Sequence, residues 1–296
     1  MKNYLKTYLK IFNIRSSSAG FTLIELMIAM ALTTIVVSAA GFGLVSMTNN
    51  NKKAEAKTQR RIELSRALDF ISDDIRMASS ISDTSVTAPT WATNNDTNDP
   101  DNQLLDWINN LGGGSPFAKL YMQIPIKFDK IATSSITAKQ HGFSAGNAVN
   151  FTGSDTDLAA ANLSKDVVYY VTKDPATDSF KVSNSISNAT NGVARSLNDV
   201  ASSGSLTVNR LLIYYIRTNT STWLPPRTIN RSAGPCLDPY EASNCPALVD
   251  SIADTNGFTA SVTSSRQAEL RLLGKISNNS TQTYEVSTKV FARANP

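Results

Sequence analysis

The chain has 296 residues, of which 41% are hydrophobic and 18% are charged, so it can bury a core beneath a mainly neutral, polar surface. The formal net charge is +4, but Lys2, Lys6, Lys10 and Arg15 supply four positive charges within residues 1–20, which contain no acid. The remaining residues are therefore neutral in total. This balance gives no sign of a nucleic-acid partner.

Residues 1–20 have the composition of a targeting leader, and residues 21–47 are long and apolar enough to cross a membrane as a helix. A secretory signal places its small residues after the apolar run, whereas residues 16–20 precede it, so cleavage there leaves the helix on the mature chain. The positive leader predicts that the rest of the chain lies outside the cytoplasm. Glu25 is the one ionisable side chain between residues 21 and 47, and a carboxylate inside an apolar helix indicates function.

The segment Gly20-Phe21-Thr-Leu-Ile-Glu25-Leu-Met resembles the prepilin motif of type IV pilins and type II secretion pseudopilins. The resemblance implies that a membrane prepilin peptidase cuts between Gly20 and Phe21, that Phe21 is N-methylated, and that Glu25 becomes the fifth mature residue. In the low-dielectric core of a filament the Glu25 carboxylate needs a partner, and the α-amino group of a neighbouring subunit's Phe21 can supply it. The alternative is a lone membrane anchor that tolerates the acid.

Residues 48–82 are predicted to continue the helix, because no proline occurs between residues 21 and 81. Apolar residues recur at spacings of three and four, which favours packing on a globular head over an exposed coiled-coil arm. Within the pilin family, residues 68–76 resemble the matching segment of W-type minor pilins and J-type pseudopilins. The apolar stripe consists of Leu64, Leu68, Ile71, Ile75, Ala78 and Ile81.

Residues 83–130 are predicted to be a loop region followed by the first head strand, at 118–128, which Pro125 limits to an edge position or a break. Residues 131–208 are predicted to form an inserted β module of short strands separated by turn residues. The series from His141 to Val182 resembles a small β module of phage tail and surface proteins.

Residues 209–296 are predicted to complete the sheet of the head. The near-continuous apolar run 206–217 indicates a strand buried on both faces. Residues 267–276 and 283–293 are predicted to form a closing hairpin. Parts of these strands look like cyanobacterial pseudopilins of the hormogonium polysaccharide secretion type, from which the inserted module and the two cysteines depart.

Cys236 and Cys245 lie close together behind a targeting segment, so a local disulfide is predicted, with two free thiols as the alternative. His141 is the sole histidine and lies far from both cysteines in sequence, so no metal site and no cofactor are predicted. An aspartate and a serine near His141 do not make a catalytic array, and we predict that the chain is not an enzyme.

The predicted fold is α+β and pilin-like: a long N-terminal helix packed on an antiparallel sheet head, with an inserted small β module.

The predicted function is structural, as a minor pilin or pseudopilin held by the inner membrane with a periplasmic head and then assembled into a filament. The resemblances imply that it primes assembly at the tip and supports polysaccharide secretion or gliding motility. Expected partners are prepilin peptidase, other pilins and an exported polysaccharide, but no nucleic acid. Two alternatives are an adhesin or DNA-uptake pilin with specificity in the head, and a membrane-anchored enzyme.

Overall fold

The computed structural model describes most of the chain, in two units, residues 1–55 and 56–296, which are treated separately below. Residues 1–19 of the predicted leader and residues 84–116 of the predicted loop region lie outside the described residues, as does the segment between the two cysteines. The described ranges are 20–83, 117–201, 206–218, 224–236, 245–276 and 281–293.

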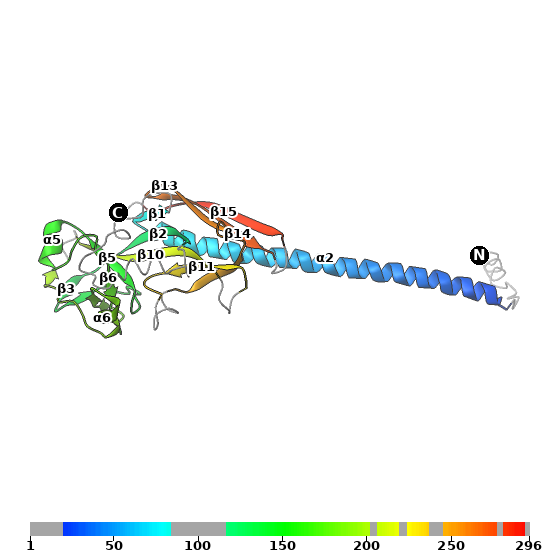
Figure 1. Ribbon diagram of the computed structural model, residues 1–296, viewed down its shortest axis with the longest axis horizontal. Helices are drawn as coiled ribbons and strands as arrows, with labels where there is room; N and C mark the ends of the chain where they lie inside the picture. The colour runs from blue at the N-terminus through cyan, green and yellow to red at the C-terminus, as the bar shows by residue number, and fades with distance from the viewer. Residues whose placement is uncertain are drawn as a thin grey trace, which may run out of the picture. The chain divides into compact units, whose positions relative to one another are not determined.

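Helix α2 spans Leu23–Met77 without interruption, and the three asparagines at 49–51 do not break it (Figure 1). Its first part is exposed throughout, and its most apolar window has a mean hydropathy of 2.1. By length and composition this helix can cross a membrane.

The second part of α2, from residue 56 on, packs against the sheet of the head. All six residues of the predicted apolar stripe are at most 6% exposed and belong to one core with residues of the sheet. The prediction of a helix packed on a head is therefore confirmed for this part, and an exposed coiled-coil arm is wrong.

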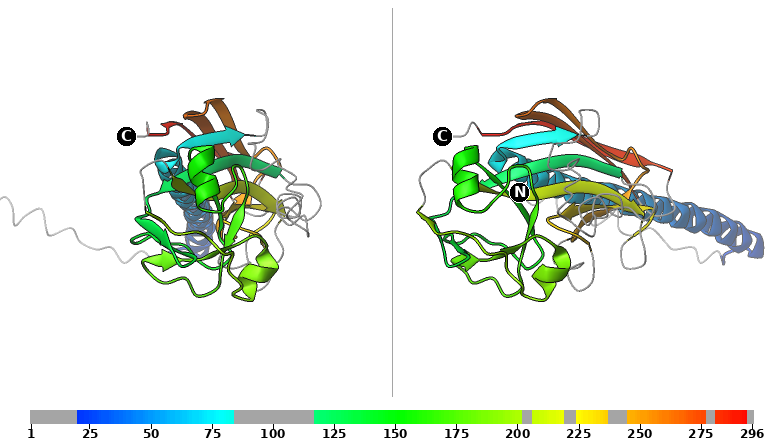
Figure 2. Two further views of the ribbon diagram at one scale, coloured as in Figure 1. Left: turned by 90° about the vertical axis from the view of Figure 1, so that its left-hand side faces the viewer. Right: turned by 60° about the vertical axis from the view of Figure 1, so that its left-hand side comes forward.

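Eleven strands of the described residues form one antiparallel sheet, and four more form a second, smaller sheet (Figures 1 and 2). The large sheet has the order β13-β14-β12-β11-β10-β5-β6-β8, with β1 and β2 on the other side of β10 and β15 beside β14. The small sheet has the order β7-β4-β3-β9. The strands are β1 (Ser80–Asp83), β2 (Phe117–Ile126), β3 (Lys130–Ala132), β4 (Ser135–Thr137), β5 (Ala148–Thr152), β6 (Tyr169–Val171), β7 (Ser179–Phe180), β8 (Val182–Ser183), β9 (Val200–Ala201), β10 (Thr207–Thr218), β11 (Arg227–Ser232), β12 (Ala247–Ile252), β13 (Phe258–Ser264), β14 (Gln267–Lys275) and β15 (Thr283–Phe291), with short helices α5 (Asp155–Ala160) and α6 (Ile186–Thr190).

Strand β10 organises the head, because it pairs with β2 along one edge and with β5 and β11 along the other. Its side chains alternate between two cores. Leu212, Tyr214 and Ile216 pack with α2, whereas the intervening residues Ile213 and Tyr215 belong to a core on the opposite face of the sheet. The predicted strand buried on both faces is thus confirmed.

Strand β2 has a neighbouring strand on both sides over part of its length, but Pro125 lies at an edge position. The strand pairs with β1 over residues 120–123 and with β10 over most of its length. Pro125 lies opposite Asn209 of β10 and beyond the last residue that pairs with β1. The missing N–H of the proline therefore falls where, among the described residues, only β10 is hydrogen-bonded to β2.

Residues 131–208 contribute to both sheets. Strands β5, β6 and β8 extend the large sheet through the pairing of β5 with residues 207–210 of β10. Strands β3, β4, β7 and β9 form the small sheet, and a separate core that includes Phe151, Tyr169 and Phe180 lies among these elements. The division of the head at 131 and 208 stays a prediction, because residue 208 lies within β10, which pairs with both β5 and β2 at this residue.

Strands β14 and β15 form the predicted closing hairpin, in unbroken register from Gln267 opposite Phe291 to Lys275 opposite Thr283. In β1, the N–H of Ile81 donates to the carbonyl of Ser265, in the turn between β13 and β14, at 3.1 Å. After β15, the N–H of Arg293 donates to the carbonyl of Arg76 at 3.1 Å, which joins the end of the hairpin to the last turn of α2.

Candidate assembly site at the start of the helix

Gly20, Phe21 and Thr22 precede the first turn of α2 and are not helical. Phe21 is 86% exposed. A Cβ atom added to Gly20 would meet nothing within 4 Å, so the fold of this chain does not require glycine at this position. The peptide bond between Gly20 and Phe21 is thus an exposed, non-helical bond directly before a helix.

Thr22 and Glu25 cap the helix reciprocally. The Thr22 hydroxyl oxygen accepts from the Glu25 N–H at 3.3 Å, and Glu25 Oε2 accepts from the Thr22 N–H and hydroxyl, both at 3.2 Å. This is a capping box, which satisfies backbone N–H groups that the first turn leaves unpaired. Among the described residues no cation lies within ion-pair distance of Glu25. Within the described part of the chain, hydrogen bonds from Thr22 hold its carboxylate.

Three further polar side chains of the apolar segment are satisfied within the helix. The hydroxyl of Thr33 donates to the carbonyl of Ala29 at 2.7 Å, and that of Thr34 donates to Met30 at 2.8 Å. Ser38 donates to the Thr34 carbonyl at 2.7 Å. These three hydroxyls therefore need no hydrogen bond from water, whereas the charged carboxylate of Glu25 would be costly in an apolar environment.

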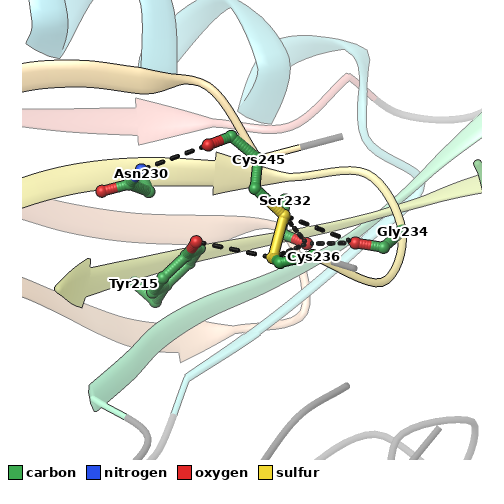
Figure 3. The surroundings of a disulfide bond; sticks show 6 residues. All are labelled: Tyr215, Asn230, Ser232, Gly234, Cys236 and Cys245. Atoms are coloured by element: carbon green, nitrogen blue, oxygen red, sulfur yellow. Dashed lines mark hydrogen bonds between the residues drawn. A yellow bond between two sulfur atoms is a disulfide. The ribbon is translucent and has the colours of Figure 1, made fainter. Parts of the chain in front are cut away.

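Cys236 and Cys245 form a disulfide with a Cα–Cα distance of 5.7 Å (Figure 3). It lies beside the end of β11. The side-chain amide of Asn230 donates to the carbonyl of Cys245 at 3.2 Å, and the hydroxyl of Ser232 donates to the Gly234 carbonyl at 2.7 Å. These contacts fix both ends of the loop closed by the disulfide to the sheet.

His141 is 4% exposed and uses both ring nitrogens in the fold. Nδ1 accepts from the N–H of Phe143 at 2.9 Å, which leaves Nε2 to donate to the carbonyl of Ala176 at 2.8 Å. The ring also contacts the rings of Phe143 and Phe180. His141 therefore positions a turn and has no free nitrogen for a metal or a substrate. Within the described ranges, no group of three or more metal-ligating side chains occurs.

A buried polar cluster that sequence reasoning missed joins α2 to the sheet. Asp74 Oδ2 accepts from the Tyr214 hydroxyl at 2.6 Å and from Arg231 Nε at 2.8 Å. Burial, reinforced by the negative charge of Asp74, raises the pKa of Tyr214 well above its usual value of 10. Burial, with Arg231 nearby, lowers the pKa of Arg210 to about 10. The three residues of the cluster are far apart in sequence, so spacing gave no signal for it.

The chain combines a long helix that is apolar and exposed in its first part, with one acid in its first turn, and an antiparallel sheet head, which fits a membrane-anchored α+β protein. Residues 15–46 match the family described as the prokaryotic N-terminal methylation motif. The match and the helix together support a type IV pilin-like protein that is a substrate of prepilin peptidase. The motif indicates a structural protein rather than an enzyme.

No curated protein matches the chain. Among solved structures, "Phage phi92 endosialidase" is similar at 13% sequence identity, over 57% of this chain and 31% of that chain, with a TM-score of 0.19. The chain thus spans about a third of the length of that protein. A TM-score this low supports no inference about fold or function.

Proposed function

We propose that the chain is a minor pilin or pseudopilin, cleaved by prepilin peptidase between Gly20 and Phe21 and N-methylated on Phe21. Before assembly, α2 holds it in the inner membrane by a single pass with its head in the periplasm. The observation that carries the proposal is the prepilin motif at an exposed, non-helical bond. Gly20 is not needed by this chain's own fold, which supports a role in recognition by the peptidase.

Cleavage would create an α-amino group on Phe21, next to Thr22 and at the same helix end as Glu25. Each subunit would then carry one cation and one acid at the start of α2. A carboxylate in a packed bundle of apolar helices is costly unless it is paired, and the α-amino group of a neighbouring subunit is a fitting partner. This pairing favours one axial register between subunits, which is what a filament needs.

The place of the subunit within a filament rests on the sequence resemblances. The segment 68–76 supports a W- or J-type subunit, which would prime assembly at the tip. The patches of the head strands support a role in polysaccharide secretion or gliding motility.

Mass spectrometry of the mature N-terminus tests the proposal. We expect a chain that begins with methylated Phe21, and an intact leader or cleavage at another bond would contradict it. Gly20→Leu should block this cleavage and leave the head folded. Gly41→Ala is the matched control, because a Cβ atom at Gly41 also meets nothing within 4 Å, and we expect normal cleavage.

A further inference from the structure

A small polar cavity lies in the head, on the hairpin that joins β6 to β8. Its volume is about 260 Å³, just below the range of drug-sized ligand sites, about 300–1,000 Å³, so it fits one ring-sized ligand. The lining residues are Ser135, Thr172, Lys173, Asp174, Pro175, Ala176, Ser179, Phe180, Lys181 and Gly192. We propose that this cavity binds an acidic sugar residue, such as a uronic acid, of an extracellular polysaccharide.

Two lysines of the hairpin, Lys173 and Lys181, line the cavity, and both are exposed to solvent. The N–H of Thr172 donates to the carbonyl of Lys181 at 3.0 Å, which continues the antiparallel pairing of β6 with β8. The N–H of Lys173 donates to Ala189 of α6 at 3.1 Å. A Cβ atom at Gly192, whose φ is +73°, would lie 3.3 Å from Lys173 Cε, so the lysine stem rests on this glycine. Both cations are thus presented by anchored backbone.

The charges at the cavity fit an anion. Among the described residues, neither Lys173 nor Lys181 has an acid within 4.0 Å, and Asp174 has no cation at that distance. Because Lys173 and Lys181 line the same cavity, an anion bound there can interact favourably with both positive charges. Asp174 reduces the total charge of the lining to +1, which favours a ligand with a single negative charge over a phosphate dianion.

The remaining polar groups fit a polyol. Hydroxyls of Ser135 and Ser179 can donate to and accept from sugar hydroxyls, and the Asp174 carboxylate can accept from them. The turn that bears Asp174 is held by His141, whose Nε2 bonds to Ala176. Phe180 is 2% exposed and offers no open ring face, so binding rests on polar contacts.

Binding of a galacturonic acid trisaccharide to the full chain in detergent micelles tests the proposal, with maltotriose as the neutral probe. We expect the acidic probe to bind at least about tenfold more tightly than the neutral one, since charge-assisted hydrogen bonds are the strong ones. Lys173→Ala with Lys181→Ala should weaken the acidic probe about tenfold or more, and arginine at both positions should restore it. Lys139→Ala with Lys165→Ala removes the same charge from two lysines that are likewise exposed but lie outside the cavity, and we expect unchanged binding.

Equal binding of both trisaccharides, or unchanged binding by the Lys173 and Lys181 variant, would overturn the proposal. Displacement of the acidic trisaccharide by an equal concentration of sulfate would show a general anion site instead, and would also overturn it. None of these outcomes depends on cleavage at Gly20, so the cavity and the proposed function are tested separately.

Discussion

Arg231 on β11 donates a hydrogen bond from Nε to Asp74 on α2 at 2.8 Å, across the interface between helix and sheet. Tyr214 of β10 donates to the same carboxylate oxygen. The Asp74 side chain is 7% exposed and that of Arg231 is 19% exposed, so the pair is largely shielded from water. It links the helix to two neighbouring strands of the head.

Asp74→Ala should lower the free energy of unfolding of the head by about 3–5 kcal/mol, because it leaves Arg231 buried and unpaired. Asp73→Ala is the control, since Asp73 pairs with Arg76 at the surface and both side chains are more than half exposed. That change should cost at most about 1 kcal/mol. Denaturant unfolding of the full chain in micelles measures both. An equal loss of unfolding free energy in the two variants would show that the buried pair contributes no more to stability than the surface pair.

Stability of the head should fall as the pH rises above 10. Burial raises the pKa of Tyr121, and burial with Asp74 raises that of Tyr214, so the folded state keeps protons that the unfolded state loses. Their contribution is complete below pH 10 and is lost as the pH rises toward the folded pKa values. Arg210 acts oppositely: burial lowers its pKa to about 10, so its unfavourable burial as a cation is relieved as the pH rises above 10.

Above pH 10, Tyr121 and Tyr214 make stability fall with pH, and Arg210 makes it rise. Since two groups act in the first direction and one in the second, the net slope of stability against pH should be negative. Tyr214→Phe should make this slope shallower, while it removes the hydrogen bond to Asp74 at every pH. Denaturant midpoints between pH 9 and 11.5 give the slopes. Parallel curves for the wild type and the variant would contradict the assignment to Tyr214.

Periodicity predicted the elements whose burial is one-sided or complete. The stripe from Leu64 to Ile81 and the run 206–217 were predicted because apolar spacing reports directly which faces are covered. The pairing of β5 with residues 207–210 was not predicted, since strand partners depend on contacts between distant segments. The reciprocal cap of Thr22 and Glu25 has a local signal, a threonine three residues before a glutamate at a helix start. The cap was not predicted, because Glu25 was interpreted only as an acid within a membrane-spanning segment.

The disulfide gives a prediction about compartment. If the head folds in the periplasm, thiol alkylation of the unfolded, unreduced chain should label neither Cys236 nor Cys245, and alkylation after reduction should label both. Mass spectrometry of the alkylated chain measures this labelling. Labelling without reductant would place the head in a reducing compartment.

The disulfide also gives a prediction about stability. Cys236→Ser with Cys245→Ser should lower the free energy of unfolding by about 3 kcal/mol, because the cross-link closes a loop of about ten residues.

Two substitutions at Glu25 separate the cap from the charge. Glutamine can accept the Thr22 hydrogen bonds and keep the capping box, whereas leucine removes both the cap and the charge. If assembly requires an ion pair with the α-amino group of a neighbouring subunit, Glu25→Gln and Glu25→Leu should both be cleaved after Gly20 and both be absent from filaments. Thr22→Ala, which weakens the cap by about 1 kcal/mol but keeps the charge, should still enter them. The amount of each variant in sheared filaments, relative to the amount in the membrane fraction, measures its incorporation. Normal incorporation of Glu25→Gln would show that the Glu25 side chain caps the helix and that its charge is not needed for assembly.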